Sequence, residues 1–437
     1  MAKLYKNIGA PRNKKIQVYQ PILITNFMLQ SHFFLFTMQA HITWPGGRVV
    51  MQRTANPCMP VRFRPWPPNS IMIENLTLTD FRNHKTSRID MRGARNIIIV
   101  GENGAGKTAI LEAVSMLSGD RGMRGSDMTD IARFDGNGGF SVYGETTDGD
   151  SVSVYFNSND TNRRAKINDE SATLSELGKL LQIVWISPKE DRLFVDSSAD
   201  RRAFFDRLAN NFDPQHNGRT AKFNKLLSER AFALKSGADT NWLNALDDQL
   251  AGTAVTIAAA RVQYAGQVNY FLSGFSVSVD GLLEKMIIAG QPAAAVEREY
   301  RNYLAKNREL VSDKMVLDGP HKSDFGMFNN ELKLPVKLTS TGQQKMALFD
   351  LILAHTNLLH TKTHRSTIAL FDEAAAHLDA GARAKIFGTL SKTHTQVWAT
   401  GLDEKSFVDI PNAIIVTCKN GKISNILYGK GEKDGTN

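Results

Sequence analysis

The feature that most constrains this chain is an eight-residue phosphate-binding pattern set between a strand and a helix. Residues 101–108 have the sequence GENGAGKT and match G-x-x-x-x-G-K-[ST] at every fixed position. An apolar run of strand length, 96–100, precedes the pattern, and apolar residues at helical spacing follow it over 109–117. Because glycines let backbone N–H groups surround a polyphosphate at a helix N-terminus, the sequence predicts a nucleotide-binding loop.

Each position of this loop has an expected role. Lys107 is expected to contact the β- and γ-phosphates of ATP, and the hydroxyl of Thr108 to coordinate Mg²⁺. The remaining loop residues are expected to surround the phosphates; they are Gly101, Glu102, Asn103, Gly104, Ala105 and Gly106. The alternative is a purely structural glycine-rich turn, and the flanking strand and helix argue against it.

A second apolar strand supplies the carboxylates that such a site needs. Residues 367–371, TIALF, lead directly into Asp372 and Glu373. Asp372 is expected to bind the same metal ion, and Glu373 to polarise the attacking water as a general base. An Asp-Glu pair after a strand usually faces solvent, but together with the phosphate loop it predicts hydrolysis. Lys107 and Glu373 are therefore the candidate catalytic residues.

A large insertion separates these two motifs. Thr108 and Asp372 lie 264 residues apart, more than a compact nucleotide-binding core requires. Strand patterns disappear between about 200 and 310, and Thr240 is a candidate N-cap for a helix there. Leucine and isoleucine recur after it at heptad-like spacing, at Leu243, Leu246, Leu250 and Ile257. We expect a helical insertion, which either projects as an arm or packs as a subdomain.

Hairpin signals add an antiparallel layer to this α/β fold. Residues 140–156 alternate polar and apolar side chains around Asp148-Gly149, and Asn420-Gly421 joins two further strand patterns. The predicted fold class is α/β, a P-loop ATPase head with an antiparallel β layer and an inserted helical arm. Its expected parts are a first half, 72–199, the insertion, 200–312, and a second half, 313–437.

The first 71 residues differ from the rest in charge. The chain carries 53 Lys and Arg against 44 Asp and Glu, and residues 1–70 hold nine of the basic residues and no acidic one. The body is therefore neutral, and the net charge of +9 does not argue that the body binds DNA. Three explanations stay open for this segment: a start codon upstream of the true one at Met72, a basic arm that contacts DNA or a partner, and a targeting leader.

The composition excludes several classes of protein. Only two cysteines occur, Cys58 and Cys418, so a disulfide framework is not expected and a reducing, cytoplasmic compartment fits. The most apolar stretch, 22–36, is interrupted by polar residues and is too short for a membrane span.

A third motif resembles that of a known superfamily. Residues 339–345, TSTGQQK, precede a helical pattern, and in isolation they indicate a simple N-cap. In a P-loop chain, with Gly342 lying 30 residues before Asp372, they resemble the signature motif of ABC-type ATPases. That resemblance implies that Ser340 and Gly342 bind the γ-phosphate of a nucleotide held by the opposite subunit, and that Gln343 also acts across the dimer. It also places residues 376–379, with Asp379, at the D-loop.

Longer strings are similar to those of the RecF family, ABC-type ATPases related to the heads of SMC proteins. The resemblance covers about 72–437 and rests on 78–84 (LTDFRNH), 191–194 (DRLF), 201–208 (RRAFFDRL), 319–324 (GPHKSD) and 372–379 (DEAAAHLD). It implies an ATP-dependent homodimer that binds junctions of single- and double-stranded DNA, hydrolyses ATP slowly and, with RecO and RecR, helps load RecA. It also implies a link to the SOS response, and places Arg82 and Asn83 near the base or ribose.

Two features depart from this resemblance. Lys189 occupies a position where relatives carry an uncharged Q-loop residue, and a lysine cannot ligate Mg²⁺. Residues 1–70 have no counterpart in the family. Thr400, at the position where many ABC ATPases have a switch histidine, agrees with the RecF resemblance. The alternatives are an ABC transporter ATP-binding subunit and a nucleolytic repair ATPase.

The DNA contact itself is not fixed by the sequence. Several basic residues are candidates, with internal ion pairs as the alternative for the last two; they are Arg163, Arg164, Lys166, Arg201 and Arg202.

Overall fold

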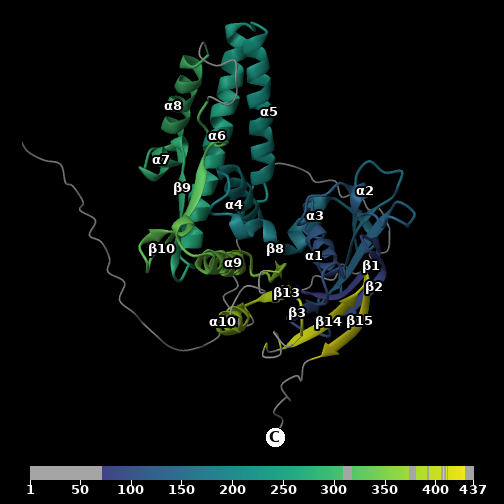
Figure 1. Ribbon diagram of the computed structural model, residues 1–437. Helices are drawn as coiled ribbons and strands as arrows, with labels where there is room; N and C mark the ends of the chain where they lie inside the picture. The colour runs from purple at the N-terminus through teal and green to yellow at the C-terminus, as the bar shows by residue number, and fades with distance from the viewer. Residues whose placement is uncertain are drawn as a thin grey trace, which may run out of the picture. The chain divides into compact units, whose positions relative to one another are not determined.

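A computed structural model describes most of the chain outside its first 70 residues (Figure 1). The described residues are 71–308, 317–373, 380–390, 393–404, 407, 410 and 412–428. The predictions for residues 1–70 and for the D-loop at 376–379, including Asp379, therefore lie outside the described residues.

A six-stranded, mainly parallel sheet forms the centre of the head. Its strand order is β15-β14-β3-β13-β12-β8, and only the β14–β15 pair is antiparallel. The strands are β3 (Asn96–Val100), β8 (Gln182–Ile186), β12 (Thr367–Phe371), β13 (Thr395–Gly401), β14 (Ala413–Lys419) and β15 (Lys422–Tyr428). The continuous apolar runs at 96–100 and 367–371 are strands buried at every position, as predicted.

An antiparallel sheet forms a second layer, as the hairpin signals predicted. Its order is β2-β1-β4-β5-β6-β7. The strands are β1 (Ile73–Phe81), β2 (His84–Asp90), β4 (Phe140–Thr146), β5 (Ser151–Phe156), β6 (Arg164–Ile167) and β7 (Glu170–Ala172). Gly149 takes a positive φ of 83° in the β4–β5 turn, and Asn420 and Gly421 take 49° and 70° in the β14–β15 turn, where glycine and asparagine are favoured.

Helix α1 (Lys107–Met116) packs in the hydrophobic core that the two sheets share. That core joins Leu76 and Val142 of the antiparallel sheet to Ile97 of the central sheet. The buried Gln396 of β13 links the layers through polar groups, because its side chain bonds both the N–H (3.0 Å) and the carbonyl (2.8 Å) of Ile73. Short helices α2 (Met128–Ile131) and α3 (Leu174–Leu180) lie in the loops of this half.

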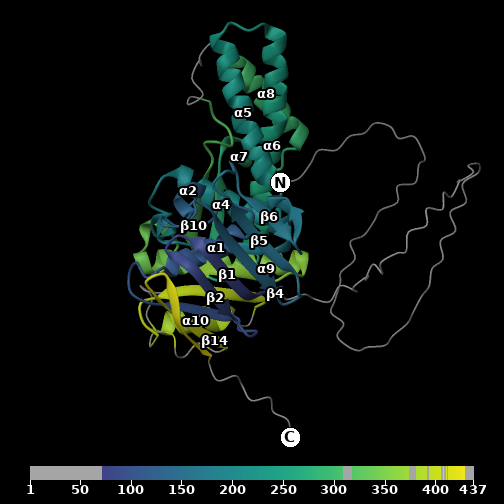
Figure 2. The same ribbon diagram turned by 90° about the vertical axis from the view of Figure 1, so that its right-hand side faces the viewer.

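The insertion is helical and has a core of its own. Helices α5 (His216–Lys235) and α6 (Thr240–Asn269) lie side by side and extend away from the two sheets (Figures 1 and 2). Its other helices are α4 (Ser198–Phe212), α7 (Leu282–Ile288) and α8 (Ala293–Lys306). The N-cap of α6 is Asp239 rather than Thr240, since the Asp239 carboxylate accepts the N–H groups of Asn241 and Trp242.

The expectation that strands are absent from 200–310 is wrong at one place. β9 (Phe275–Asp280) pairs with β10 (Asp324–Asn329), which pairs in turn with the two-residue strand β11 (Leu334–Pro335). The segment FSVSVD does alternate apolar and polar side chains, but its partner strand lies beyond α7 and α8. The second half of the head continues with α9 (Thr341–Thr363) and α10 (Ala380–Leu390).

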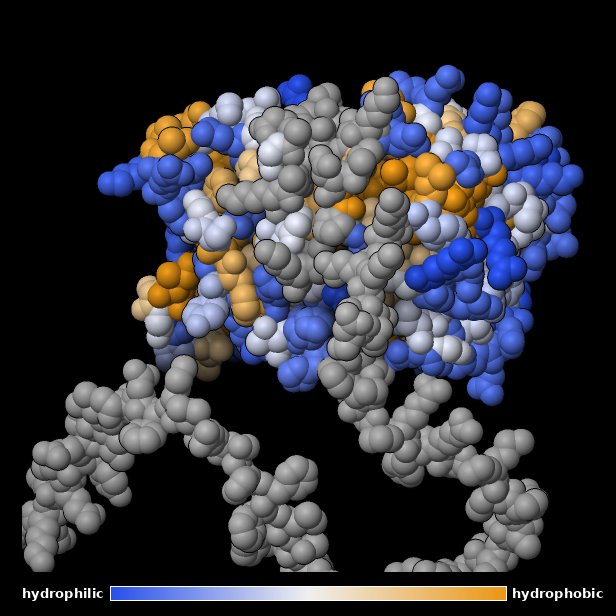
Figure 3. All heavy atoms as spheres, turned by 90° about the horizontal axis from the view of Figure 1, so that it is seen from below, coloured by the Kyte–Doolittle hydropathy of each residue, from blue (hydrophilic) through white to orange (hydrophobic). Residues whose placement is uncertain are grey.

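No helix in the described part of the chain has the length and apolar character needed to span a membrane. On the face seen from below, hydrophobic residues form separate groups among hydrophilic ones (Figure 3).

A buried ion-pair network ties α4 to α6 at the base of the insertion. Arg261 of α6 donates from Nε and Nη2 to the two carboxylate oxygens of Asp206 on α4, at 2.9 and 2.7 Å, and His216 bonds the same carboxylate at 2.8 Å. Burial alone raises the pKa of Asp206, but the hydrogen bonds from His216 and Arg261 outweigh it, so the pKa is lowered.

We predict that Asp206→Asn lowers the free energy of unfolding by about 3–5 kcal/mol at neutral pH, because it leaves Arg261 buried with an incomplete set of partners. Asp248→Asn is the matched control, since its pair with Arg301 is exposed and is expected to contribute less than about 1 kcal/mol. Urea denaturation measures both.

The pH dependence follows from the lowered pKa of Asp206. Its stabilising effect is complete above the unfolded value of about 4 and is lost as pH falls through the folded value. The difference between wild type and Asp206→Asn should therefore shrink below about pH 4. An unchanged difference there would contradict the assignment.

Candidate functional site

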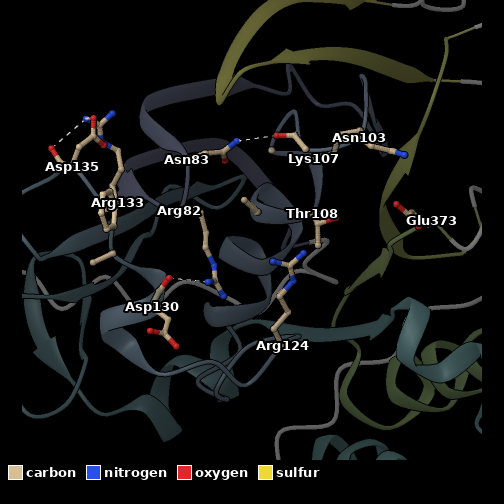
Figure 4. Close-up of a pocket in the computed structure, with 15 residues that line it drawn as sticks. Arg82, Asn83, Asn103, Lys107, Thr108, Arg124, Asp130, Arg133, Asp135 and Glu373 are labelled. Atoms are coloured by element: carbon tan, nitrogen blue, oxygen red, sulfur yellow. Dashed lines mark hydrogen bonds and ion pairs between the residues drawn. The ribbon is translucent and has the colours of Figure 1, made fainter.

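A cavity of about 670 Å³ opens beside the phosphate loop (Figure 4). It is lined by both motifs that the sequence predicts, with Lys107 and Thr108 from the loop and Glu373 from the end of β12. The β1–β2 turn and the segment after α2 complete the wall, so elements from both halves of the head meet there.

The phosphate loop packs against two turns, the β1–β2 turn and the β14–β15 turn. Gly106 has φ +111°, and a Cβ there would lie 2.6 Å from Nε2 of His84 and 2.8 Å from Oδ1 of Asn83. The buried His84 ring bonds the Gly106 carbonyl at 3.1 Å, and the N–H of Gly421 donates to the Ala105 carbonyl at 2.8 Å. Only glycine fits at position 106, because both the backbone angle and the space exclude a side chain.

Lys107 is held inside the loop. Its side chain is buried, and Nζ donates to the carbonyls of Gly101 at 2.7 Å and Glu102 at 2.9 Å. An ammonium group has three donors, so one remains for a phosphate oxygen.

The predicted metal ligands lie next to each other. The hydroxyl of Thr108 donates to Oδ1 of Asp372 at 3.0 Å, which brings together residues 264 positions apart. Strand β13 lies between β3 and β12 in the sheet, and the hydroxyl of its Thr400 donates to the same Asp372 oxygen at 2.9 Å. Burial raises the pKa of Asp372, against the hydrogen bonds from Thr400 and Thr108. A hydroxyl and a carboxylate are oxygen donors of the kind that Mg²⁺ prefers, so these residues fit that ion.

Glu373 is placed by its backbone rather than by its side chain. Its N–H donates to the Thr400 hydroxyl at 2.8 Å, and its φ of 52° lies in the left-handed region. The exposed side chain lines the cavity, and in Figure 4 it lies across from Thr108.

Three polar residues at this site were not among the candidates from the sequence. Thr400 is fully buried and serves Asp372 and Glu373 together. Glu112 of α1 is fully buried, and its two carboxylate oxygens accept hydrogen bonds from Nη2 and Nε of Arg82 at 2.7 and 2.9 Å. Arg124 lines the cavity as an exposed cation near Asp372. Glu112 and Arg124 lie outside the predicted motifs, and Thr400 lies at the switch position of ABC ATPases.

Arg82 and Asn83 line the cavity but also have structural partners. Asn83 donates to the Gly104 carbonyl at 3.3 Å, and Arg82 contacts Glu112, Ser126 and the Asp130 carbonyl. Their contact with a base or ribose stays a prediction.

The signature residues lie outside this cavity. Ser340 is the N-cap of α9 and forms a reciprocal capping box with Gln343, while Gly342 is exposed with open space around it. None of the three lines the cavity. Lys189 does not line it either, and its exposed Nζ lies 3.9 Å from Asp200.

Comparison with known proteins identifies the family. The model of the RecF/RecN/SMC N-terminal domain matches residues 72–425. The DNA replication and repair protein RecF of Rhizobium meliloti is 35% identical over 376 residues, which cover 82% of this chain and all of that protein. RecF of Mesorhizobium japonicum is 35% identical over 360 residues, covering 78% of this chain and 94% of that protein. The chain belongs to the RecF family.

Solved structures of RecF share the fold. Two are described as the recombination mediator protein RecF in the RecFOR pathway, one with ATP and one with ATPrS. Both have a TM-score of 0.70, at 23% and 22% identity, and cover 82% and 81% of this chain and 99% and 97% of theirs. The RecF-like, ABC-type ATPase head predicted from the sequence is thus confirmed.

The role of Thr400 can be tested directly. Thr400→Val removes the donor to Asp372 and the acceptor for the Glu373 N–H, so Mg²⁺-dependent nucleotide binding should weaken about 10- to 100-fold. Thr400→Ser keeps the hydroxyl and should stay close to wild type. Binding of a fluorescent ATP analogue over a Mg²⁺ titration measures both, and equal curves for the two variants would refute the role.

Proposed function

We propose that this RecF-family protein is a slow, cytoplasmic ATPase whose ATP-bound homodimer binds DNA in recombinational repair. The observation that carries the enzymatic part is that Thr108 and Glu373, from segments far apart in the chain, line one cavity, and that the buried Asp372 accepts the Thr108 hydroxyl. Those are the groups that ATP hydrolysis requires.

Each residue of the site has a separate role in ATP binding or hydrolysis. The loop from Gly101 to Gly106 offers backbone N–H groups to the phosphates, and Lys107 adds a positive charge. Thr108 and Asp372 would hold Mg²⁺, which when bound would neutralise charge on the phosphate oxygens. Glu373 orients and deprotonates the attacking water, and Arg124 contributes a further positive charge.

The dimer accounts for the position of the signature residues. Ser340, Gly342 and Gln343 lie at the N-terminus of a 23-residue helix, away from the cavity of their own subunit. A helix N-terminus favours an anion, so these residues suit the γ-phosphate held by the partner, and we propose that Asp379 of the D-loop also contributes to binding that nucleotide. ATP then joins two subunits, and hydrolysis releases them.

The DNA-related part is supported by the family. The curated relatives are DNA replication and repair proteins, and the solved RecF structures belong to the RecFOR pathway. We therefore propose binding at junctions of single- and double-stranded DNA, with RecO and RecR as partners, RecA loading as the outcome and the SOS response as the wider context. Residues 1–71 are proposed to lie outside this working unit, whose parts are 72–199, 200–312 and 313–437.

Lys107→Ala tests the coupling of ATP to the other activities. It removes the positive charge within the loop, so ATP binding, dimerisation and DNA association should be lost together. Nucleotide binding, light scattering and fluorescence anisotropy with a gapped DNA measure the three, and Lys306→Ala on α8 is the control. A Lys107→Ala protein that still binds the junction would refute ATP coupling.

Glu373→Gln tests the general base. The amide cannot accept the proton from water but keeps the shape of the site, so hydrolysis should fall by about 10²–10⁴-fold and an ATP-bound dimer should accumulate. Light scattering at saturating ATP gives the dimer fraction, and Glu331→Gln is the control. A variant that stays monomeric would argue against the ATP-bound dimer.

A further inference from the structure

The basic residues singled out in the sequence separate into two groups in the structure. Arg201 forms a two-point bond with Asp324 at 2.7 and 2.8 Å, and Arg202 donates to the Ser323 carbonyl at 2.7 Å. Arg163 donates to the Gly119 carbonyl at 2.7 Å. The guanidinium groups of these three arginines are bonded to groups within the protein, so we do not propose them as DNA contacts. Arg164 and Lys166, on β6, stay accessible: the Arg164 side chain is 61% exposed although it pairs with Asp160, and Lys166 is half-buried.

Strand β6 lies in the antiparallel sheet, with β4 and β5 beside it (Figure 2). Its Ala165 is buried, while Arg164 is exposed and Lys166 half-buried, so these two side chains face outward. Inward residues of β4 and β5 are buried, while the alternating residues of both strands are half-buried and face outward. The strand registers place the outward residues in rows across the sheet.

Two adjacent rows define what we call the open sheet face. One row runs from β2 to β6 as Thr86, Thr79, Ser141, Tyr155 and Arg164. The next runs from β2 to β7 as Arg88, Thr77, Tyr143, Ser153, Lys166 and Ser171. The two rows combine cations, tyrosines and hydroxyls, and neither contains a carboxylate.

Carboxylates border this face, and two of them, Glu145 and Asp169, act electrostatically on Tyr143. The following row holds Asp90 and Glu145. Glu145 is engaged by Asn75 at 2.8 Å and by the Tyr143 hydroxyl at 3.1 Å, and Arg164 pairs with Asp160 at 2.6 Å. The two rows themselves thus hold three cations, Arg88, Arg164 and Lys166, among aromatic and hydroxyl groups.

This combination has the chemistry that single-stranded nucleic acid requires. Cations and hydroxyls bind phosphates, and aromatic rings stack with unpaired bases of any sequence. Lys166 Nζ already lies 5.7 Å from the centre of the Tyr155 ring, so a base on that ring would meet a positive charge. Six strands at about 4.8 Å spacing span roughly 24 Å, enough for a few nucleotides.

We infer that the open sheet face binds single-stranded DNA, with Tyr143 and Tyr155 stacking on bases and Arg88, Arg164 and Lys166 contacting the backbone. The inference rests on the proposed DNA-binding function and assigns it a surface. Duplex DNA cannot offer free base faces to the tyrosines, so this face discriminates for the single strand.

The first experiment uses the wild-type chain with ATP and a single-stranded oligonucleotide containing 5-iododeoxyuridine. Ultraviolet crosslinking followed by peptide mass spectrometry should identify the β4 and β5 peptides that contain Tyr143 and Tyr155. Crosslinks found only elsewhere would overturn the assignment. Failure of the wild type to bind any DNA would instead refute the proposed function.

The second experiment compares variants by fluorescence anisotropy with a labelled oligothymidine. Tyr143→Ala/Tyr155→Ala should bind about ten-fold or more weakly, while Tyr143→Phe/Tyr155→Phe, which keeps both rings, should stay within two-fold of wild type. Tyr270→Ala is the control, because that tyrosine is 87% exposed at the end of α6. Unchanged ATP-analogue binding verifies that the head is intact.

A third measurement separates the cations from the rings. Arg88→Ala/Lys166→Ala should make the plot of log affinity against log salt concentration less steep by about 1.4, since each phosphate contact to a single strand contributes about 0.7. Lys306→Ala should leave the slope unchanged. If both sets of variants kept wild-type affinity and slope, or lost duplex and single-strand binding equally, the open sheet face would not be the site.

Discussion

The hydrogen bond between Thr108 and Asp372 is the contact on which the head depends, because it closes a site whose two halves are 264 positions apart. It forms only if β3 and β12 run parallel with one strand between them. β13 is that strand, and it pairs with both. Its Thr400 hydroxyl then joins the same carboxylate, so one strand sets both the spacing of the motifs and the orientation of Asp372.

Much of this arrangement follows from local sequence rules. The strands at 96–100 and 367–371 are predicted with the bounds observed, because a strand buried on both faces is apolar throughout. The turns at Asp148-Gly149 and Asn420-Gly421 are predicted because few residues tolerate positive φ. The phosphate loop needs only its own eight residues and their neighbours to be recognised.

What local rules miss are partners distant in the chain. β9 alternates as a strand should, but its partner β10 comes only after two further helices. The ion pairs of the arginines show the same limit of local rules. No sequence pattern near Arg261 indicates an ion pair with Asp206. Likewise, none near Arg201 indicates that its partner is Asp324. The roles of Thr400 and Glu112 likewise depend on strands and helices brought together from elsewhere.

The contacts that support the phosphate loop come from the C-terminal end of the chain, which is synthesised last. The Ala105 carbonyl of the loop accepts hydrogen bonds from the Gly421 N–H and from the thiol of Cys418, which lies 313 positions further along the chain. β14, which carries Cys418, also pairs with β3 directly before the loop. During synthesis these segments leave the ribosome long after the loop itself, so a nascent chain lacks the support that gives the loop its shape. The shape of the phosphate loop therefore depends on segments at the C-terminal end of the head, and it is complete only once those strands have folded against β3.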